Sequence, residues 1–194
     1  MSFYFKKYFN NLYQTTKFIN FKELYKISNL IEKNIKNNQH IFVAGNGGSA
    51  AIANHLLCDF NKGIKKSSKN KLKPKIISLS NSIELITAIS NDIDYKKIFT
   101  FQLDNYCKKG DSLICFSSSG QSKNIIDVLS FAKKKGIKTV LFQGFGKINK
   151  KINPNFYINL NCKNYGITED IFQSFMHTVS QYIRSKYSNT QEIL

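Results

Sequence analysis

Two short segments combine glycine with small hydroxyl or amide residues in the way that anion-binding turns do. They are residues 45–50, with the sequence GNGGSA, and residues 117–122, with the sequence SSSGQS. Glycine lets the backbone approach a ligand closely, while serine hydroxyls and free backbone N–H groups can bind phosphate oxygens without a metal. The pair of turns therefore predicts a site for one compact phosphorylated ligand.

A second set of residues has the chemistry for proton transfer or metal binding. His55 and Asp59 lie four residues apart after the first turn, so on a helix they project from one face toward a shared ion. Glu169 and His177 are two helical turns apart, about 12 Å of rise, and share a site only if both lean toward it. Gln173, one turn before His177, is the alternative to Glu169 as the partner of His177.

These residues also have structural interpretations. A single histidine on an apolar helix is often a buried core residue. Glu169 and Asp170 could simply be acids that stabilise the N-terminal part of a helix through its dipole. His40, just before the first strand, is interpreted as structural or solvent-exposed.

The apolar pattern predicts the scaffold that must position these groups. Short apolar runs separated by helical patterns occur at residues 41–44, 76–79, 113–116, 139–142 and 156–160. Such strands are typical of a parallel sheet buried on both faces. We therefore predict an α/β, doubly wound, three-layer sandwich with a five-stranded parallel sheet of the flavodoxin-like type. Both turns follow strands, at the sheet edge where ligands bind.

The same pattern divides the chain into three parts. Residues 1–37 form an N-terminal helical extension with an amphipathic helix over residues 21–35, residues 38–188 form the α/β domain that carries both turns, and residues 189–194 form a C-terminal tail. Residues 62–75 are polar and basic without periodicity, which predicts a loop.

The charge of the chain is strongly positive. Lys and Arg number 29 against 12 Asp and Glu, which gives a formal net charge of +17. This balance suits a polyanionic or acidic partner, but it is also what AT-rich coding produces. The lysines are spread over loops and helix ends without a nucleic-acid-binding motif, so nucleic acid is not expected as a partner. Their positive field would attract a phosphorylated ligand.

Composition also bears on the compartment. Four cysteines, Cys58, Cys107, Cys115 and Cys162, show neither a CxxC pair nor zinc-finger spacing, and we interpret them as reduced core thiols. No apolar run approaches the roughly 20 residues that span a bilayer, and the N-terminus lacks the order of a signal peptide. We expect a cytoplasmic protein without a membrane partner.

A dinucleotide site is the first alternative for the turn at residues 45–50, which we call the glycine turn. Gly45, Gly47 and Ala50 match the GxGxxG/A fingerprint. That interpretation requires an acidic residue after the second strand, where residues 78–81 read SLSN. It also leaves unexplained the turn at residues 117–122, which we call the serine turn. We therefore expect no nucleotide cofactor.

Together, the two turns resemble the sugar isomerase (SIS) domain family, in particular its phosphoheptose isomerases. The resemblance covers nearly the whole chain, including residues 90–92 and the last helix. It implies an aldose/ketose isomerase that converts sedoheptulose 7-phosphate to D-glycero-D-manno-heptose 7-phosphate through an enediol. It also implies a role in lipopolysaccharide or capsule heptose synthesis and a homotetramer with sites at subunit interfaces.

The resemblance further assigns roles to single residues. It implies that phosphate is held by the serine turn and that the sugar is lined by the glycine turn and the last helix, through Ser117, Ser118, Ser119, Ser122, Asn46, Gly47, Gly48, Ser49 and Glu169. The catalytic pair becomes Asp59 and His177. Some members bind zinc, and the matching positions here are His55, Asp59, Glu169 and His177.

The chain departs from the family pattern at three places. Asp59 stands where the family usually has Glu, Glu169 where it has Gln, and the usual Arg is replaced near Lys62, which leaves Lys62 or Lys65 as anion contacts. The altered carboxylates keep a second function open. This is a non-catalytic SIS module that binds a phosphosugar or associates with the replication initiator DnaA.

Overall fold

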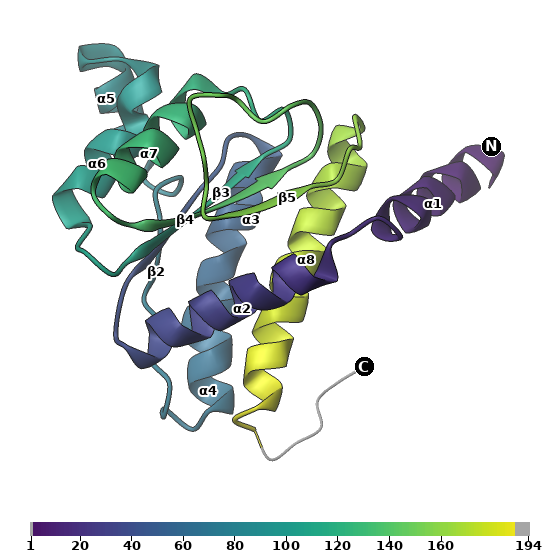
Figure 1. Cartoon of the computed structure of the whole chain (residues 1–194), viewed down its shortest axis with the longest axis horizontal. Helices are drawn as coiled ribbons and strands as arrows, with labels where there is room; N and C mark the ends of the chain where they lie inside the picture. The colour runs from purple at the N-terminus through teal and green to yellow at the C-terminus, as the bar shows by residue number, and fades with distance from the viewer. Residues whose placement is uncertain (1, 189–194) are drawn as a thin grey trace.

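A five-stranded, all-parallel sheet lies at the centre of the structure, a computed structural model that describes residues 2–188 (Figure 1). The predicted C-terminal tail, residues 189–194, lies outside the described residues. Each predicted strand is confirmed to within one residue at either end, and the strands are β1 (Ile41–Ala44), β2 (Ile76–Ser78), β3 (Ser112–Ser117), β4 (Lys138–Gln143) and β5 (Phe156–Asn159).

The strand order places the two turns side by side. The order is β2-β1-β3-β4-β5, so the chain leaves β1 toward one side of the sheet and later returns on the other side as β3. Loops that leave two such neighbouring strands separate from each other and open a crevice at the carboxyl edge of the sheet. The fold prediction is confirmed, and the crevice lies between the glycine turn and the serine turn.

Alternation along the strands divides the apolar side chains between two cores. In β1, Ile41 and Val43 belong to one core, whereas Phe42 and Ala44 belong to the other. The first core is covered by α2 (Phe21–Lys36), α3 (Gly48–Leu56) and α8 (Tyr165–Ser185), and the second by α5 (Ile83–Asp92), α6 (Ile98–Tyr106) and α7 (Lys123–Lys134). This is the predicted three-layer arrangement.

The N-terminal helices differ in how they contact this body. The predicted helix at residues 21–35 is α2, capped by Asn20, and its apolar side chains Leu24, Ile27, Ile31 and Ile35 are buried in the first core. The preceding helix α1 (Ser2–Thr16) has no buried residue, and Figure 1 shows it extending away from the molecule. Between residues 2 and 188, no helix combines the length and apolar character that crossing a bilayer requires.

The loop prediction for residues 62–75 is wrong in its first part. The chain continues from α3 into the π-helix η1 (Leu57–Ile64) and the short α4 (Lys65–Ser67) before it becomes irregular. The reason is apolar burial, because Phe60 and Ile64 are fully buried in the first core and hold this segment helical. The prediction of core thiols is also wrong for Cys58, which is exposed in η1.

A buried carboxylate fixes the far end of α8 against α2. Glu32 accepts hydrogen bonds from Lys186 Nζ at 2.7 Å and Tyr187 Oη at 2.6 Å, and it pairs with Lys36 at 2.9 Å. Burial by itself would raise the pKa of Glu32, but these donors outweigh it and lower the pKa to about 2. This network ties the residues just after α8 to α2.

Candidate functional site

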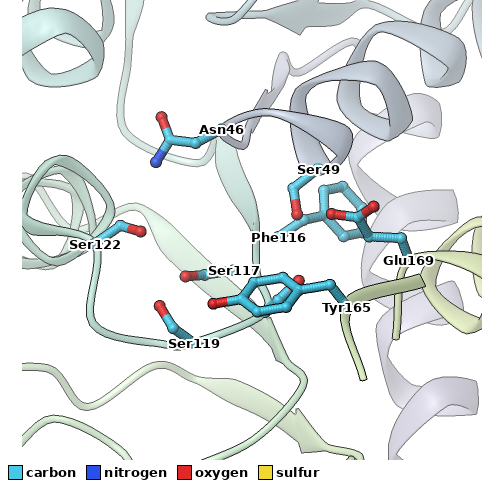
Figure 2. Close-up of a pocket in the computed structure, with 9 residues that line it drawn as sticks. Asn46, Ser49, Phe116, Ser117, Ser119, Ser122, Tyr165 and Glu169 are labelled. Atoms are coloured by element: carbon cyan, nitrogen blue, oxygen red, sulfur yellow. The ribbon is translucent and has the colours of Figure 1, made fainter. Parts of the chain in front are cut away.

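A pocket at the carboxyl ends of β1 and β3 collects most of the predicted substrate residues (Figure 2). Its volume of about 150 Å³ is smaller than the roughly 300–1,000 Å³ of cofactor pockets, so it suits one small group. Its walls come from both turns, the end of β3 and the start of α8, and are formed by Asn46, Ser49, Phe116, Ser117, Ser118, Ser119, Ser122, Tyr165 and Glu169.

The serine turn keeps two of its four hydroxyls free of hydrogen bonds within the turn. Ser117 Oγ accepts from the N–H of Gly120 and Ser119 Oγ accepts from the N–H of Gln121, each at 3.2 Å, which holds the turn in shape. Ser118 Oγ is buried and has no hydrogen-bond partner among the described residues. Ser122 precedes α7 without a capping hydrogen bond from its side chain. A buried hydroxyl without a partner costs stability unless a ligand satisfies it, so this turn is suited to an oxygen-rich anion.

The glycine turn contributes the N-terminus of α3. Gly47 has a φ of +54°, a conformation that glycine adopts without strain, and α3 begins immediately after it. A Cβ atom on Gly48 would overlap the Glu169 carboxylate, so this glycine permits α8 to approach the turn. The turn therefore supplies free N–H groups at a helix N-terminus, and Ser49, 3% exposed, faces the same pocket.

Glu169 forms the wall of the pocket on the α8 side. Figure 2 shows its carboxylate near Ser49, and the Tyr165 ring, one turn earlier on α8, extending toward Ser117 and Ser119. Burial, and secondarily the charge of Asp170, raises the pKa of Glu169. The pocket therefore contains a carboxyl group that takes up a proton more readily than an exposed glutamate.

We expect Glu169→Gln to stabilise the protein at neutral pH. A raised folded-state pKa means that the folded chain binds the proton more tightly than the unfolded chain, so wild-type stability falls as pH rises above the usual glutamate value of about 4.3. The substitution removes that loss. Thermal unfolding of both proteins across the pH range should show a gain in Tm at neutral pH that disappears in acid.

Glu32→Gln is the control, for which we expect a change in Tm of opposite sign at neutral pH. Because the Glu32 pKa is lowered to about 2, its stabilising effect is present above about pH 4.3 and is lost as pH falls through 2. This variant should have a lower Tm at neutral pH. A Glu169→Gln gain that is the same at every pH would contradict the assignment.

Three predicted residues from two distant segments meet at a second site, which shares α3 and α8 with the pocket. His55 Nε2 and His177 Nε2 are 3.2 Å apart, and Asp59 Oδ2 lies 3.3 Å from the first and 3.4 Å from the second. Asp59 Oδ2 is buried and has no hydrogen-bond partner among the described residues. Two imidazole nitrogens and a carboxylate oxygen therefore converge on one point.

Local helix geometry explains how Asp59 reaches this point. His55 lies in the last turn of α3, and Asp59 lies four residues later in η1. A π-helix has wider turns than an α-helix and occurs often at functional sites. Ser180 Oγ donates to the Asp59 carbonyl oxygen at 3.2 Å, which ties η1 to α8 beside His177. The shorter aspartate thus contacts both histidines.

Glu169 and Gln173 are the two α8 residues that could neighbour His177, and the structure distinguishes them. Gln173, one turn before His177, places its side-chain amide 2.8 Å from His177 Nε2. Glu169 is not part of the group formed by His55, Asp59 and His177 among the described residues, and its carboxylate lies in the serine pocket instead. Because the two residues are one turn apart, α8 presents one to each half of the site.

The donor set fits a divalent transition metal. The three atoms lie within 4.8 Å of one another. Their separations of 3.2, 3.3 and 3.4 Å match the spacing of about 3.3 Å between ligands in a tetrahedral zinc site. Zinc is commonly bound by imidazole nitrogen and carboxylate oxygen. The orphaned Asp59 oxygen supports the same conclusion.

Comparison with known proteins assigns the chain to a family. Residues 4–144 match the SIS domain family. The phosphoheptose isomerase of Aliarcobacter butzleri is 33% identical over 168 residues, which are 86% of each chain. The chain belongs to the SIS domain family, among its phosphoheptose isomerases. A second such relative, from Campylobacter concisus, is 30% identical over 79% of this chain and 80% of its own.

The SIS fold extends over almost the whole protein. The structure of the phosphoheptose isomerase of Neisseria gonorrhoeae superposes with a TM-score of 0.80 at 20% identity, and the match covers 95% of this chain and 96% of that one. The strand β5 and the helix α8 with His177, which lie beyond residue 144, therefore belong to the shared architecture.

Some residues of this SIS domain lie where the sequence did not indicate. Lys62 and Lys65 line a separate surface hollow with Asn61 and Lys66, not the serine pocket. Tyr165 was missed as a pocket residue. A signal for it existed, because it precedes Glu169 by four residues and so shares its helix face.

Proposed function

We propose that this SIS domain protein is an isomerase that converts sedoheptulose 7-phosphate to D-glycero-D-manno-heptose 7-phosphate, for lipopolysaccharide or capsule heptose synthesis. The observation that supports it most is that two candidate sites share the helices α3 and α8. One is the pocket beside the serine turn, where the buried Ser118 hydroxyl has no partner among the described residues, and the other is the group formed by His55, Asp59 and His177. Glu169 and His177, both on α8, connect them.

The two sites divide the substrate between them. In this proposal the phosphate occupies the serine turn, where Ser118 and Ser122 offer hydroxyls and the N-terminus of α7 offers backbone N–H groups. Asn46, Ser49 and Glu169 contact the sugar hydroxyls along the wall of the pocket. The carbonyl end of the sugar then reaches His177.

Aldose/ketose isomerisation moves a proton between C1 and C2 through an enediol. It requires a base that removes the proton from carbon and an acid that neutralises the developing charge on oxygen. His177 and Asp59 are 3.4 Å apart, close enough to share these roles. An imidazole has an ordinary pKa near 6.5, which suits proton transfer in either direction. We assign the acid and base roles to this pair.

We further propose that zinc occupies the histidine and aspartate group. His55, Asp59 and His177 would hold it, with Gln173 as the nearest further donor and Glu169 facing the substrate side. When bound, the ion would polarise the carbonyl oxygen of the sugar. Because Nε2 of His177 faces the other two groups, this nitrogen would bind the ion, and it could take up a proton only while the ion is absent.

We expect zinc binding to depend on all three residues. Calorimetric titration with ZnCl₂ should show one strong site in the wild type, and Asp59→Asn or His55→Gln should weaken it by more than about 100-fold, since loss of outer-shell partners alone costs 10- to 100-fold. His40→Gln changes the remaining histidine, which lies beside Asp111 before β1, and should leave the affinity unchanged. Equal affinity in the Asp59→Asn variant would overturn the site.

Direct assay tests the proposed activity and its alternative together. Purified protein is incubated with sedoheptulose 7-phosphate, with and without added zinc, and heptose 7-phosphate is measured. Turnover supports the isomerase. Calorimetric binding of the sugar phosphate without turnover under either condition would instead favour the non-catalytic SIS module.

We also propose that the protein works as a homotetramer. The support is apolar surface that one chain leaves uncovered, because aromatic side chains on the protruding α1 are more than half exposed, namely Phe3, Tyr4, Phe5, Phe9 and Tyr13. Such a patch marks an association surface. Sedimentation velocity should give four times the monomer mass of 22.3 kDa, and a monomer at micromolar concentration would contradict the proposal.

A further inference from the structure

A pair of asparagines joins the glycine turn to the helix that follows the serine turn. Asn46 Nδ2 donates to Asn124 Oδ1 at 3.0 Å, and Asn124 Nδ2 donates to Asn46 Oδ1 at 2.9 Å. Asn46 lines the pocket, whereas Asn124 lies in the first turn of α7, is 1% exposed and is not among the lining residues. Asn124 therefore contacts the site through Asn46.

One backbone group decides which way both amides face. The N–H of Ile125 donates to Asn124 Oδ1 at 2.9 Å. Because a backbone N–H can only donate, the oxygen of Asn124 must face it, and this places the Asn124 nitrogen against Asn46 Oδ1. The hydroxyl of Tyr95 donates to the same Asn46 oxygen at 3.0 Å. The Asn46 oxygen thus accepts two hydrogen bonds, which uses both of its lone pairs.

The Asn46 nitrogen keeps one N–H for a ligand. A side-chain amide has two N–H donors, and only one of them is directed at Asn124. In Figure 2 the Asn46 nitrogen lies on the side of Ser122, across the pocket, and its oxygen lies on the other side. With the amide reversed, Asn46 would present an acceptor to the oxygens of the ligand, which would repel it.

We infer that Asn124 is a positioning residue that holds Asn46 as a hydrogen-bond donor toward an oxygen of the sugar phosphate. The inference rests on the proposed function for the identity of that ligand. Asn124 acts on binding rather than on proton transfer, because its contacts lead to the pocket wall and not to His177. Its loss should therefore change KM more than kcat.

Asn124→Asp tests the inference with little change in shape. The carboxylate can still accept from Ile125 and Asn46, but its second oxygen then opposes Asn46 Oδ1, and two acceptors repel each other. We expect KM for sedoheptulose 7-phosphate to rise by about tenfold, the effect of one lost hydrogen bond, with kcat within about threefold of wild type.

The pH profile separates positioning from general damage. A protonated carboxyl regains a donor toward Asn46 Oδ1, so the ratio of variant to wild-type KM should approach one below the pKa of the new carboxyl and increase above it, and burial raises that pKa above the usual value of about 3.9. Dividing by the wild-type KM cancels the titration of the substrate phosphate. A ratio near one that does not vary with pH would overturn the inference.

Two further variants keep the test decisive if this carboxyl harms folding. Asn34→Asp is the matched control, because Asn34 is 2% exposed and its amide donates to the Gly110 carbonyl oxygen at 3.0 Å, away from the pocket lining. It should lower Tm and leave KM unchanged. Asn124→Ser is also made in an Asn46→Ala background. There it should alter KM by less than about twofold, because the residue that it positions is gone.

Full additivity in that double variant would overturn the positioning role. The wild-type arm reports separately on the proposed function. If wild type turns the sugar phosphate over and Asn124→Asp behaves like it, the inference alone fails. If wild type neither converts nor binds the sugar phosphate in calorimetry, the proposed function fails and this inference fails with it.

Discussion

His177→Gln is expected to lower kcat by on the order of 1,000-fold, the usual contribution of a general acid or base. Glutamine retains hydrogen-bonding groups near Asp59 and His55 but cannot take up a proton. Binding of sedoheptulose 7-phosphate in calorimetry should persist within about tenfold, because the serine turn is untouched. The measurement is steady-state kinetics beside calorimetry.

His40→Gln makes the same change at a histidine outside the site. Its ring nitrogen Nδ1 lies 3.8 Å from Asp111 before β1, at the amino end of the strands. Wild-type turnover by the His177→Gln variant would remove this residue from the mechanism. Loss of activity in the His40→Gln variant would show that the assay reports folding.

Ser122→Asp is expected to raise KM for the sugar phosphate by about 100-fold or more. The new carboxylate would face the phosphate beside uncharged serine hydroxyls, with no cation among the lining residues, and two like charges about 4 Å apart near a protein surface repel by about 4 kcal/mol. The fold should be retained or stabilised, because aspartate is as good an N-cap as serine and acids suit helix N-termini. Kinetics and thermal unfolding together check both statements.

Asn20→Asp is the corresponding control at another helix. Asn20 caps α2, and its side chain accepts from the N–H of Glu23, so the variant adds the same charge at an N-cap remote from the pocket lining. Its KM should equal that of wild type. A Ser122→Asp variant with unchanged KM and Tm would place the phosphate elsewhere.

Much of the scaffold could be predicted because it depends on local patterns. Apolar runs bounded by small residues located all five strands, since strands of a doubly wound sheet are buried on both faces. The π-helix at Leu57–Ile64 could not be read in the same way. Its last residues belong to the basic, polar stretch 62–75, which suggests a loop, and burial of Phe60 and Ile64 against distant segments keeps the segment helical.

The candidate site shows the same division. Residue types and spacing identified both turns and the pairing of His55 with Asp59, because a helix fixes the angle between residues four apart. The sequence could not decide between Glu169 and Gln173 as the neighbour of His177. That choice depends on how α8 is rotated against α3 and η1, which contacts such as Ser180 to Asp59 determine.

By itself, the sequence determined the α/β scaffold, the two anion-binding turns and the family that they resemble. Only the tertiary structure decided which serine hydroxyls remain without partners, which α8 residue faces each half of the site, and how Asn124 orients Asn46. The physical reason is that the periodicity of a helix or strand fixes the direction of each side chain only within that helix or strand. Hydrogen-bond partners across 78 residues of chain are fixed only when packing brings separate elements together.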